Sequence, residues 1–269
     1  MSSSMYLVDQ FLAVWPTILA LDLARYLIAA GLLVGVLCAF ARPLASRRIQ
    51  QRRATFADRQ REFGFSLLTV LVFSLVGFGV YFGSKHGVFR IYSGELPGTG
   101  RLLIELAIFV LLHDAYFYWA HRAMHTRWLF RRVHRLHHRS RTPTPWAAYA
   151  FAPPEALLEA AIMPLAALLL PIHELTAFLF LTHMILRNVI GHAGVEMFPS
   201  WWLRAPLLRL VTTTTHHDLH HSHGGYNFGL YFTWWDRWMN TEHPEYAIRF
   251  VAAADSRSRL KLSEEENAR

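Results

Sequence analysis

Residues 101–125 read RLLIELAIFVLLHDAYFYWAHRAMH, a mainly apolar stretch that leads directly into histidines. Its apolar part, Leu102–Trp119, is long enough to cross a bilayer as a helix. An α-helix has 3.6 residues per turn, so His121 and His125 share one face, and His113, about two turns earlier, lies on roughly the same side. The stretch therefore predicts a membrane helix that ends in a metal-binding face.

Two further histidine boxes follow, HRLHH at His134–His138 and HDLHH at His217–His221. Their i, i+3, i+4 spacing predicts that each box presents three imidazoles to one side of a single helix. The three boxes hold eight of the 16 histidines in the chain. One zinc or iron ion takes three or four protein ligands, so eight boxed histidines indicate two metals or more. Imidazole binds iron, zinc, copper and nickel, so the boxes do not identify the element.

The histidines outside the boxes differ in their expected roles. His192, in NVIGHAG, is predicted as a further ligand because the chain returns there to the side of the boxes. His216 offers an alternative register, but HxxHH matches the preceding box, which favours His217. His183, inside an apolar run, is an alternative tenth ligand, and the remaining histidines are expected in loops or near prolines and are assigned no metal: His86, His173, His223 and His243.

Polar residues near these boxes are candidates to orient the ligands. A metal-bound imidazole usually donates its second ring nitrogen to a carboxylate or a carbonyl oxygen. For each acid, a solvated charge or a salt bridge to an arginine is an equally good explanation. Asn188, one helical turn before His192, is predicted to orient a metal-bound water. The acids are Asp114, Glu196, Asp218 and Asp236.

The composition is typical of a membrane protein. Hydrophobic residues make up 53% of the chain and charged residues only 17%. The nine Trp, ten Tyr and 19 Phe suit the aromatic belts of a bilayer. The net charge of +8 comes from arginines beside apolar runs, which membrane topology explains better than nucleic-acid binding. Cys38 is the only cysteine, which excludes an intrachain disulfide and an iron–sulfur cluster.

Charge and hydropathy predict the topology. The basic run Arg42–Arg61 should be cytoplasmic, and the link Gly83–Arg101 should lie on the other side of the membrane. Asp22 and Arg25 interrupt the first apolar run and are placed to pair on one helix face. The last two apolar runs, separated by Pro171, predict a hairpin that enters and returns. The runs are Trp15–Phe40, Phe63–Phe82, Leu102–Trp119, Ala156–Leu170 and Leu175–Ile190.

These features predict an all-α integral membrane bundle of about four spans, including the hairpin, with a cytoplasmic helical cap that carries a dimetal site. We expect a single domain, in which residues 1–100 form the N-terminal spans. Residues 101–245 form the histidine-box region, and residues 246–269 form a polar tail.

The motifs HDAYFYWAHRAMH, HRLHH, NVIGHAG, HDLHH and YNFGLYFTWWDRW together resemble the fatty acid hydroxylase superfamily, also called the sterol desaturase family. The resemblance covers His113 to Thr241, and it departs at Asn240, where relatives often have Gly. It implies a membrane helical fold with a cytoplasmic cap and a two-iron centre that uses O2. The ligands that it implies are His113, His121, His125, His134, His137, His138, His192, His217, His220 and His221.

The resemblance implies hydroxylation or desaturation of an unactivated C–H bond in a sterol, fatty acyl or sphingoid lipid. Electrons are then expected from an external protein of the ferredoxin or cytochrome b type with its reductase. The expected location is a bacterial inner membrane or the endoplasmic reticulum. Zinc readily occupies imidazole sites in place of iron. Two alternatives stay open, a zinc-dependent lipid hydrolase and a membrane metal-binding protein without catalysis.

Overall fold

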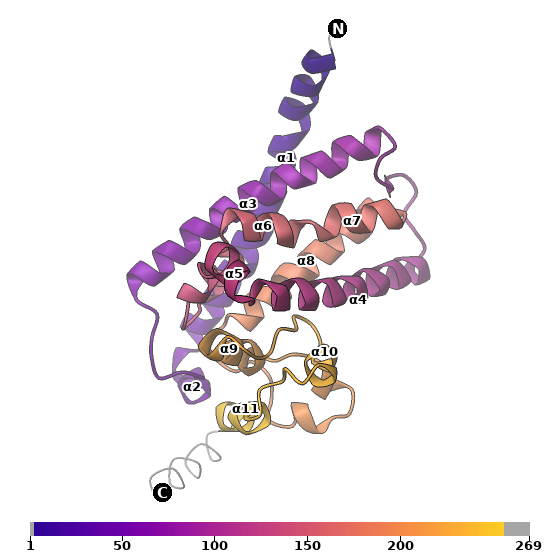
Figure 1. Cartoon of the computed structure of the whole chain (residues 1–269). Helices are drawn as coiled ribbons and strands as arrows, with labels where there is room; N and C mark the ends of the chain where they lie inside the picture. Colours follow the sequence, from indigo (N-terminus) through magenta and orange to yellow (C-terminus); the bar gives the residue numbers. More distant parts are fainter. Residues whose placement is uncertain (1–2, 256–269) are drawn as a thin grey trace, which may run out of the picture.

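The computed structural model describes residues 3–255. Three long helices dominate it, α1 (Ser3–Ala39), α3 (Phe56–Lys85) and α4 (Thr99–Met124) (Figure 1). Within the described residues, these are the three helices long and apolar enough to cross a membrane. They confirm the first three predicted apolar runs as helices. The helices are longer than the runs because polar turns extend them; α3, for example, begins with a capping box between Thr55 and Asp58.

The predicted hairpin is present, but its first arm is broken. It consists of α6 (Pro153–Ala160), α7 (Ile162–Leu169) and the returning helix α8 (Glu174–Gly191). The break between α6 and α7 has a cause in Pro164, because a proline ring clashes with the carbonyl four residues earlier in a continuous helix. Prolines 153 and 154 open α6, where the missing N–H costs nothing.

The tip of the hairpin meets the link between α3 and α4. Strand β1 (Ile91–Tyr92) pairs in parallel with β2 (Ile172–His173), with Ile91 opposite Ile172. The link and the tip therefore lie at the same end of the bundle, as the predicted topology requires. The metal-binding motifs lie toward the other end.

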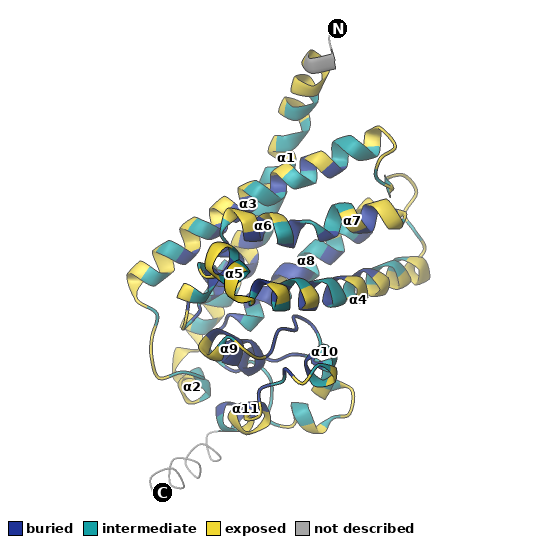
Figure 2. Ribbon diagram, in the orientation of Figure 1, coloured by how far each residue is buried: buried dark blue, intermediate teal, exposed yellow. Residues whose placement is uncertain are grey.

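Aromatic contacts hold the bundle together. The rings of Phe109 on α4 and Phe180 on α8 stack with their centroids 3.9 Å apart. Tyr26 on α1 stacks on Tyr149 of the short helix η4 (Pro145–Tyr149) at 5.8 Å. Large apolar side chains also cover the outer faces of the long helices, where Figure 2 shows exposed residues in yellow; Leu103 is 60% exposed. A helix that is apolar on its outer face suits a lipid environment.

Short elements form a cap at the histidine end of the bundle (Figure 1). The segment that carries HRLHH was expected as one regular helix, and this prediction was wrong. It is a turn of α-helix, a π-helical turn and a 3-10 turn in succession, whereas HDLHH lies on a regular helix as predicted. The cap elements are α2 (Ala41–Leu44), η1 (Ala45–Arg47), α5 (Arg127–Leu129), η2 (Phe130–His134), η3 (His137–Arg139), η5 (Trp202–Arg204), η6 (Leu208–Leu210), α9 (Thr214–His223), α10 (Trp234–Trp238) and α11 (Tyr246–Ala254).

The predicted polar tail, residues 246–269, is wrong for its first part. Residues Tyr246–Ala254 form the amphipathic helix α11, whose Tyr246 and Phe250 are buried against Leu219 of α9. The i, i+4 spacing of these two rings places them on one helix face, which is the sequence signal of an amphipathic helix. The charged residues that follow in the sequence obscure this signal. Residues 256–269 of the predicted tail lie outside the described residues.

The basic run after α1 is attached to the cap. The Arg47 side chain donates a hydrogen bond from Nε to the carbonyl of Glu196 at 2.7 Å, and the amide of Ile49 donates to the carbonyl of Gly194. The run and the histidine boxes therefore lie at the same end of the bundle. The charge pattern predicts that they lie on the same side of the membrane, and their position at one end of the bundle agrees with this prediction.

Candidate metal centre

Nine histidines converge at the end of α4 and α8 and form two adjacent clusters. Within each cluster, one ring nitrogen of every histidine lies within 4.8 Å of the others. All nine belong to the ten predicted ligands. The five-histidine cluster comprises His121, His125, His134, His138 and His220, and the four-histidine cluster comprises His137, His192, His217 and His221.

The two HxxHH boxes are each divided between the clusters, so the prediction that a box presents all its nitrogens to one side was wrong. His138 belongs to one cluster and its neighbour His137 to the other, and His220 and His221 divide in the same way. Successive residues on a helix differ in direction by about 100°, so neighbouring histidines face different sites. Each HxxHH box therefore serves two metal sites at once.

The distances between ring nitrogens fit metal coordination. In the five-histidine cluster, Nε2 of His138 lies 3.1 Å from Nε2 of His134 and 3.0 Å from Nε2 of His220. In the four-histidine cluster, Nε2 of His192 lies 3.1 Å from Nε2 of His217. Two imidazoles about 2.0–2.1 Å from one ion lie roughly 3 Å apart when their bonds are near a right angle. Each cluster therefore has the spacing of ligands around one ion.

Hydrogen bonds on the opposite ring nitrogens fix the tautomers. Nδ1 of His121 donates to the carbonyl of Phe228 at 2.9 Å, and Nδ1 of His220 donates to that of Tyr226 at 2.7 Å. Nδ1 of His192 donates to the carbonyl of Asn188 at 2.8 Å. A carbonyl only accepts, so each Nδ1 carries the proton and each Nε2 presents a lone pair. Lone pairs facing one another across 3 Å repel, and a cation between them turns this repulsion into coordination, so both clusters fit a metal ion.

One carboxylate is hydrogen-bonded to the imidazole ring of a cluster histidine, and the sequence analysis missed this carboxylate. Glu155, in the first turn of α6, accepts a hydrogen bond from Nδ1 of His134 at 2.6 Å, and both groups are almost completely buried. Only acids close to the histidine boxes in sequence were considered. The sequence feature that could have indicated Glu155 is its position in the first turn of a helix that begins with prolines 153 and 154, directly after an aromatic segment.

Two predicted orienting acids instead stabilise the loop that passes over the clusters. Asp114 accepts hydrogen bonds from the amides of residues 231 and 232 and from the indole of Trp234. Asp236 accepts from the amides of Phe228 and Gly229, and so it positions the carbonyl that receives the His121 proton. Asp236 therefore acts on a ligand through the backbone, while Asp114 ties this loop to α4.

The other predicted polar residues do not contact a cluster ring through their side chains. The Glu196 carboxylate accepts from the amide of Thr215 at the start of α9, which carries HDLHH. Asp218 accepts from the Gln50 side chain. The Asn188 side chain donates to the carbonyl of Ala148, and its backbone carbonyl accepts from His192. These residues hold the elements that carry the ligands.

The tenth predicted ligand, His113, lies outside both clusters. Its Nδ1 is hydrogen-bonded to the Tyr231 hydroxyl at 2.8 Å, and its ring packs edge-on against Phe180. His113 is two turns before His121 on α4, which places it deeper in the bundle than the clusters. His216 also lies outside the clusters, next to Asp236 at 3.4 Å, so the preference for His217 is confirmed. His86, His173, His183, His223 and His243 also lie outside the two clusters.

Burial keeps the cluster imidazoles neutral. It lowers the pKa of His125 to about 2, that of His138 to about 3 and that of His192 to about 4, and neighbouring imidazoles add to the effect at His125. A neutral imidazole has no proton to lose before it binds a metal. Burial also holds the pKa well below its usual range at His134, His137, His217, His220 and His221.

The Asn240 departure noted in the sequence has a structural explanation. Asn240 adopts φ 54°, in the left-handed region that favours glycine. Asparagine is among the non-glycine residues that tolerate this conformation best. The turn is therefore retained, and Thr241 after it donates its hydroxyl to Asp236 at 2.8 Å.

Comparison with known proteins places the chain in a family. Residues 106–241, half of the chain, match the family model described as fatty acid hydroxylase. Lathosterol oxidase of Homo sapiens is 29% identical over 184 residues, which cover 66% of this chain and 59% of the relative. A Delta(7)-sterol 5(6)-desaturase of Gibberella zeae is 30% identical, covering 68% of this chain and 55% of the relative. A methylsterol monooxygenase of Aspergillus fumigatus is 29% identical over 162 residues, with coverages of 58% and 54%.

The chain thus spans less than two thirds of the length of these relatives. No solved structure matches it. The matched segment runs from within α4 to the turn after α10 and contains all nine clustered histidines. Sequence similarity and the paired clusters agree, and the chain belongs to the fatty acid hydroxylase family.

Proposed function

We propose that this protein is an O2-dependent di-iron oxidoreductase that hydroxylates or desaturates an unactivated C–H position of a membrane lipid. The observation that carries the proposal is the pair of histidine clusters at the end of apolar helices. The names of the relatives, which include an oxidase, a desaturase and a monooxygenase of sterols, support a lipid as the substrate.

The two clusters differ in the number of imidazoles that they offer to a metal ion. Two iron ions, when bound and reduced, supply the activation of O2 that removal of hydrogen from an unactivated carbon requires. The five-histidine cluster would offer five imidazoles to an ion, and the four-histidine cluster would offer four, one fewer, which would leave that ion a position for a ligand that is not protein. The chain's own residues hold the imidazoles neutral, fix their tautomers and exclude water.

The apolar surroundings of the four-histidine cluster support a lipid substrate on that side. The His137 ring contacts the Phe151 ring, with centroids 5.1 Å apart. Phe151 in turn contacts Tyr149, which lines a large apolar cavity inside the bundle. The side of the cluster that faces the bundle is therefore aromatic rather than aqueous, as chemistry on an apolar carbon needs.

The proposal includes an external electron-donor protein and a metal centre that faces the cytoplasm. The surface segment around Phe130, whose ring lies 5.4 Å from His125 and 5.5 Å from His138, carries exposed arginines. An acidic carrier suits such a surface, and arginines beside spans also favour the cytoplasmic side. Reversing the charge of Arg131 and Arg135 together should raise the carrier concentration needed for half-maximal turnover by about tenfold and weaken its salt dependence.

The test is anaerobic reconstitution with Fe(II), followed by reductant, O2 and total lipid extract, with mass spectrometry of the products. A gain of one oxygen or a loss of two hydrogens that requires iron, reductant and O2 supports the proposal. Turnover in the absence of O2 refutes it and favours the metal-dependent hydrolase. Absence of turnover from a protein that carries two irons, with lipids from its native membrane, favours a metal-binding protein without catalysis.

A further inference from the structure

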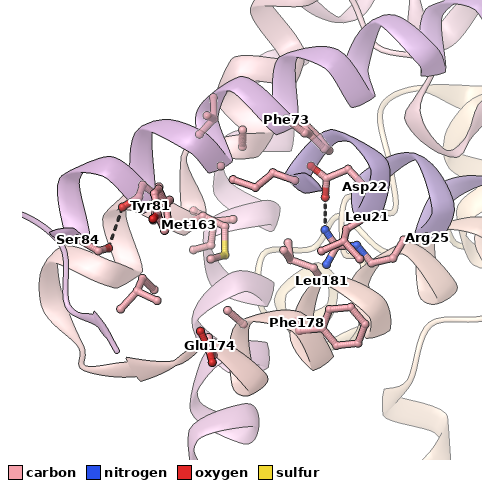
Figure 3. A pocket seen from close by; sticks show the side chains of 18 of the residues that line it. Leu21, Asp22, Arg25, Phe73, Tyr81, Ser84, Met163, Glu174, Phe178 and Leu181 are labelled. Carbon is pink, nitrogen blue, oxygen red and sulfur yellow. Dashed lines mark hydrogen bonds and ion pairs between the residues drawn. The ribbon is translucent and has the colours of Figure 1, made fainter. Parts of the chain in front are cut away.

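We propose that the cavity between α1, α3, α7 and α8 is a binding site for an uncharged lipid alcohol, whose hydroxyl group hydrogen-bonds to Glu159. The inference rests on the proposed function in one respect, that the bound lipid is the molecule to be oxidised. Figure 3 shows this cavity, with side chains from α1, α3, α7 and α8 directed into it.

The cavity has the size and shape of one lipid molecule. Its volume is about 420 Å³, within the range of pockets that hold small ligands. It is lined by α8 from Glu174 to Met184, a stretch of eleven residues that spans about 15 Å along the helix. The lining is mainly aliphatic and aromatic, with Phe73, Leu181 and Met163 among its side chains. An elongated apolar molecule of about this length fits.

The cavity is open to the bilayer. Leu21 on α1 and Phe178 on α8 both line it, yet they are 47% and 42% exposed. Because α1 is one of the three candidate spans, its exposed apolar face is surrounded by lipid rather than by water. The occupant is therefore expected to enter sideways from the membrane.

The polar groups in the wall select against charged lipids. Asp22 and Arg25, three apart on α1, form the predicted ion pair, and Arg25 also lies over the Phe178 ring (Figure 3). The pair is closed on itself, so Arg25 is not free to bind an anion. Glu159 and Glu174 face the cavity with no further arginine beside them, and Lys85 lies at the far end. The lining thus holds three carboxyl groups against two cationic side chains, and a fatty acid carboxylate or a phosphate headgroup finds few partners there.

Glu159 is the group in this wall that lacks a partner. Its residue is 8% exposed and lines the cavity, and within residues 3–255 no protein group is hydrogen-bonded to its carboxyl. A buried polar group without a partner is costly, so such a carboxyl indicates a hydrogen-bonding ligand. A hydroxyl group satisfies it in either protonation state, because a hydroxyl both donates and accepts.

The position of Glu159 relates the cavity to the metal centre. Glu159 lies one helical turn after Glu155, which is hydrogen-bonded to the cluster ligand His134. On the same side, the aromatic pair Tyr149 and Phe151 separates the cavity from His137. A hydroxyl held at Glu159 thus places the adjoining carbons of the lipid at the cavity end nearest the clusters.

The test is equilibrium binding to the full chain purified with its metals, without reductant so that no turnover occurs. The probes are radiolabelled cholesterol and hexadecan-1-ol, compared with cholest-5-ene and hexadecane, which lack the hydroxyl. We expect an alcohol to bind about tenfold more tightly than its hydrocarbon, and Glu159→Leu to abolish this preference. Glu95→Leu, on an exposed loop, is the matched control and should leave the preference unchanged.

A second variant tests the cavity itself. Ala177→Trp fills it and should weaken binding of both the alcohol and its hydrocarbon, whereas Ala107→Trp, on the exposed face of α4, should not. Metal content of two ions per chain shows that each variant is folded. The inference is overturned if Ala177→Trp leaves binding unchanged, if Glu159→Leu retains the alcohol preference, or if hexadecanoate or a phospholipid displaces the alcohols. If the alcohols bind as expected but are not oxidised when reductant and O2 are then added, the result counts against the proposed function alone.

Discussion

Glu155 provides a sharp test of the metal centre, because it is the carboxylate that contacts a cluster imidazole. Replacement by leucine removes the acceptor of the 2.6 Å hydrogen bond from His134 and leaves a buried N–H without a partner. A buried donor left without its partner costs about 1–3 kcal/mol. Loss of a partner behind a ligand lowers metal affinity by about 10- to 100-fold, or about 1.4–2.8 kcal/mol. The two estimates agree, so we expect a loss in this range.

The effect should be confined to one of the two ions. His134 belongs to the five-histidine cluster, so Glu155→Leu should weaken that ion and leave the ion of the other cluster in place. Glu155→Gln keeps an acceptor of similar size for the His134 N–H, and it should cost less than leucine does. Titration with a chelator, with metal counted by elemental mass spectrometry, should resolve two phases, of which one shifts to lower affinity and the other stays as in the unmodified protein.

Glu196→Gln is the matched control. Glu196 is as deeply buried as Glu155, but its carboxylate accepts from the backbone amides of Phe198 and Thr215 and not from an imidazole. Its replacement should leave both metal phases within about threefold of the unmodified protein. The reasoning is refuted if Glu155→Leu binds two ions with unchanged affinity, or if the control loses as much affinity as Glu155→Leu does.

Three further predictions follow from the same geometry. His137→Ala and His220→Ala should each lower the metal content of a different cluster and abolish activity, with membrane insertion intact. His86→Ala and His243→Ala are the controls and should change neither the metal content nor the activity. Full activity in His137→Ala or His220→Ala would contradict the ligand assignment. Asp114→Asn should lower the free energy of unfolding by about 2–3 kcal/mol, seen as a lower thermal midpoint, because the carboxylate accepts three hydrogen bonds from one loop; an unchanged midpoint would show that the loop is held elsewhere. In a Cys38→Ser background, the single variants Arg48→Cys and Arg135→Cys should react with a membrane-impermeant thiol reagent from the same side of the membrane. Labelling from opposite sides would overturn the predicted topology.

The histidine spacing was sufficient to find eight of the nine clustered histidines, because residues three or four apart stay close together; His192, outside the boxes, was predicted from the return of the chain to the same end. Hydropathy was sufficient to find the three long helices, since each is apolar around most of its circumference. The positions of the helix ends were less predictable, because capping residues such as Thr55 extend a helix past its apolar run.

The failures have a common physical cause, which is that they depend on contacts between distant segments. His113 has the sequence context of a ligand, but the distance along α4 places it beside Tyr231 and Phe180 instead. Glu155 is far from the boxes in the chain, and it reaches His134 only because α6 packs against the HRLHH segment.

Local sequence determined the helices that are long and apolar enough to cross a membrane and the histidine boxes that enter the two clusters, because helical periodicity and hydropathy act over a few neighbouring residues. The tertiary structure was needed to assign each imidazole to its ion, since adjacent histidines face opposite clusters. It was also needed to find the carboxylate behind His134 and the cavity that Glu159 faces. Those features arise where separate helices pack against one another, and no short stretch of sequence determines such tertiary contacts.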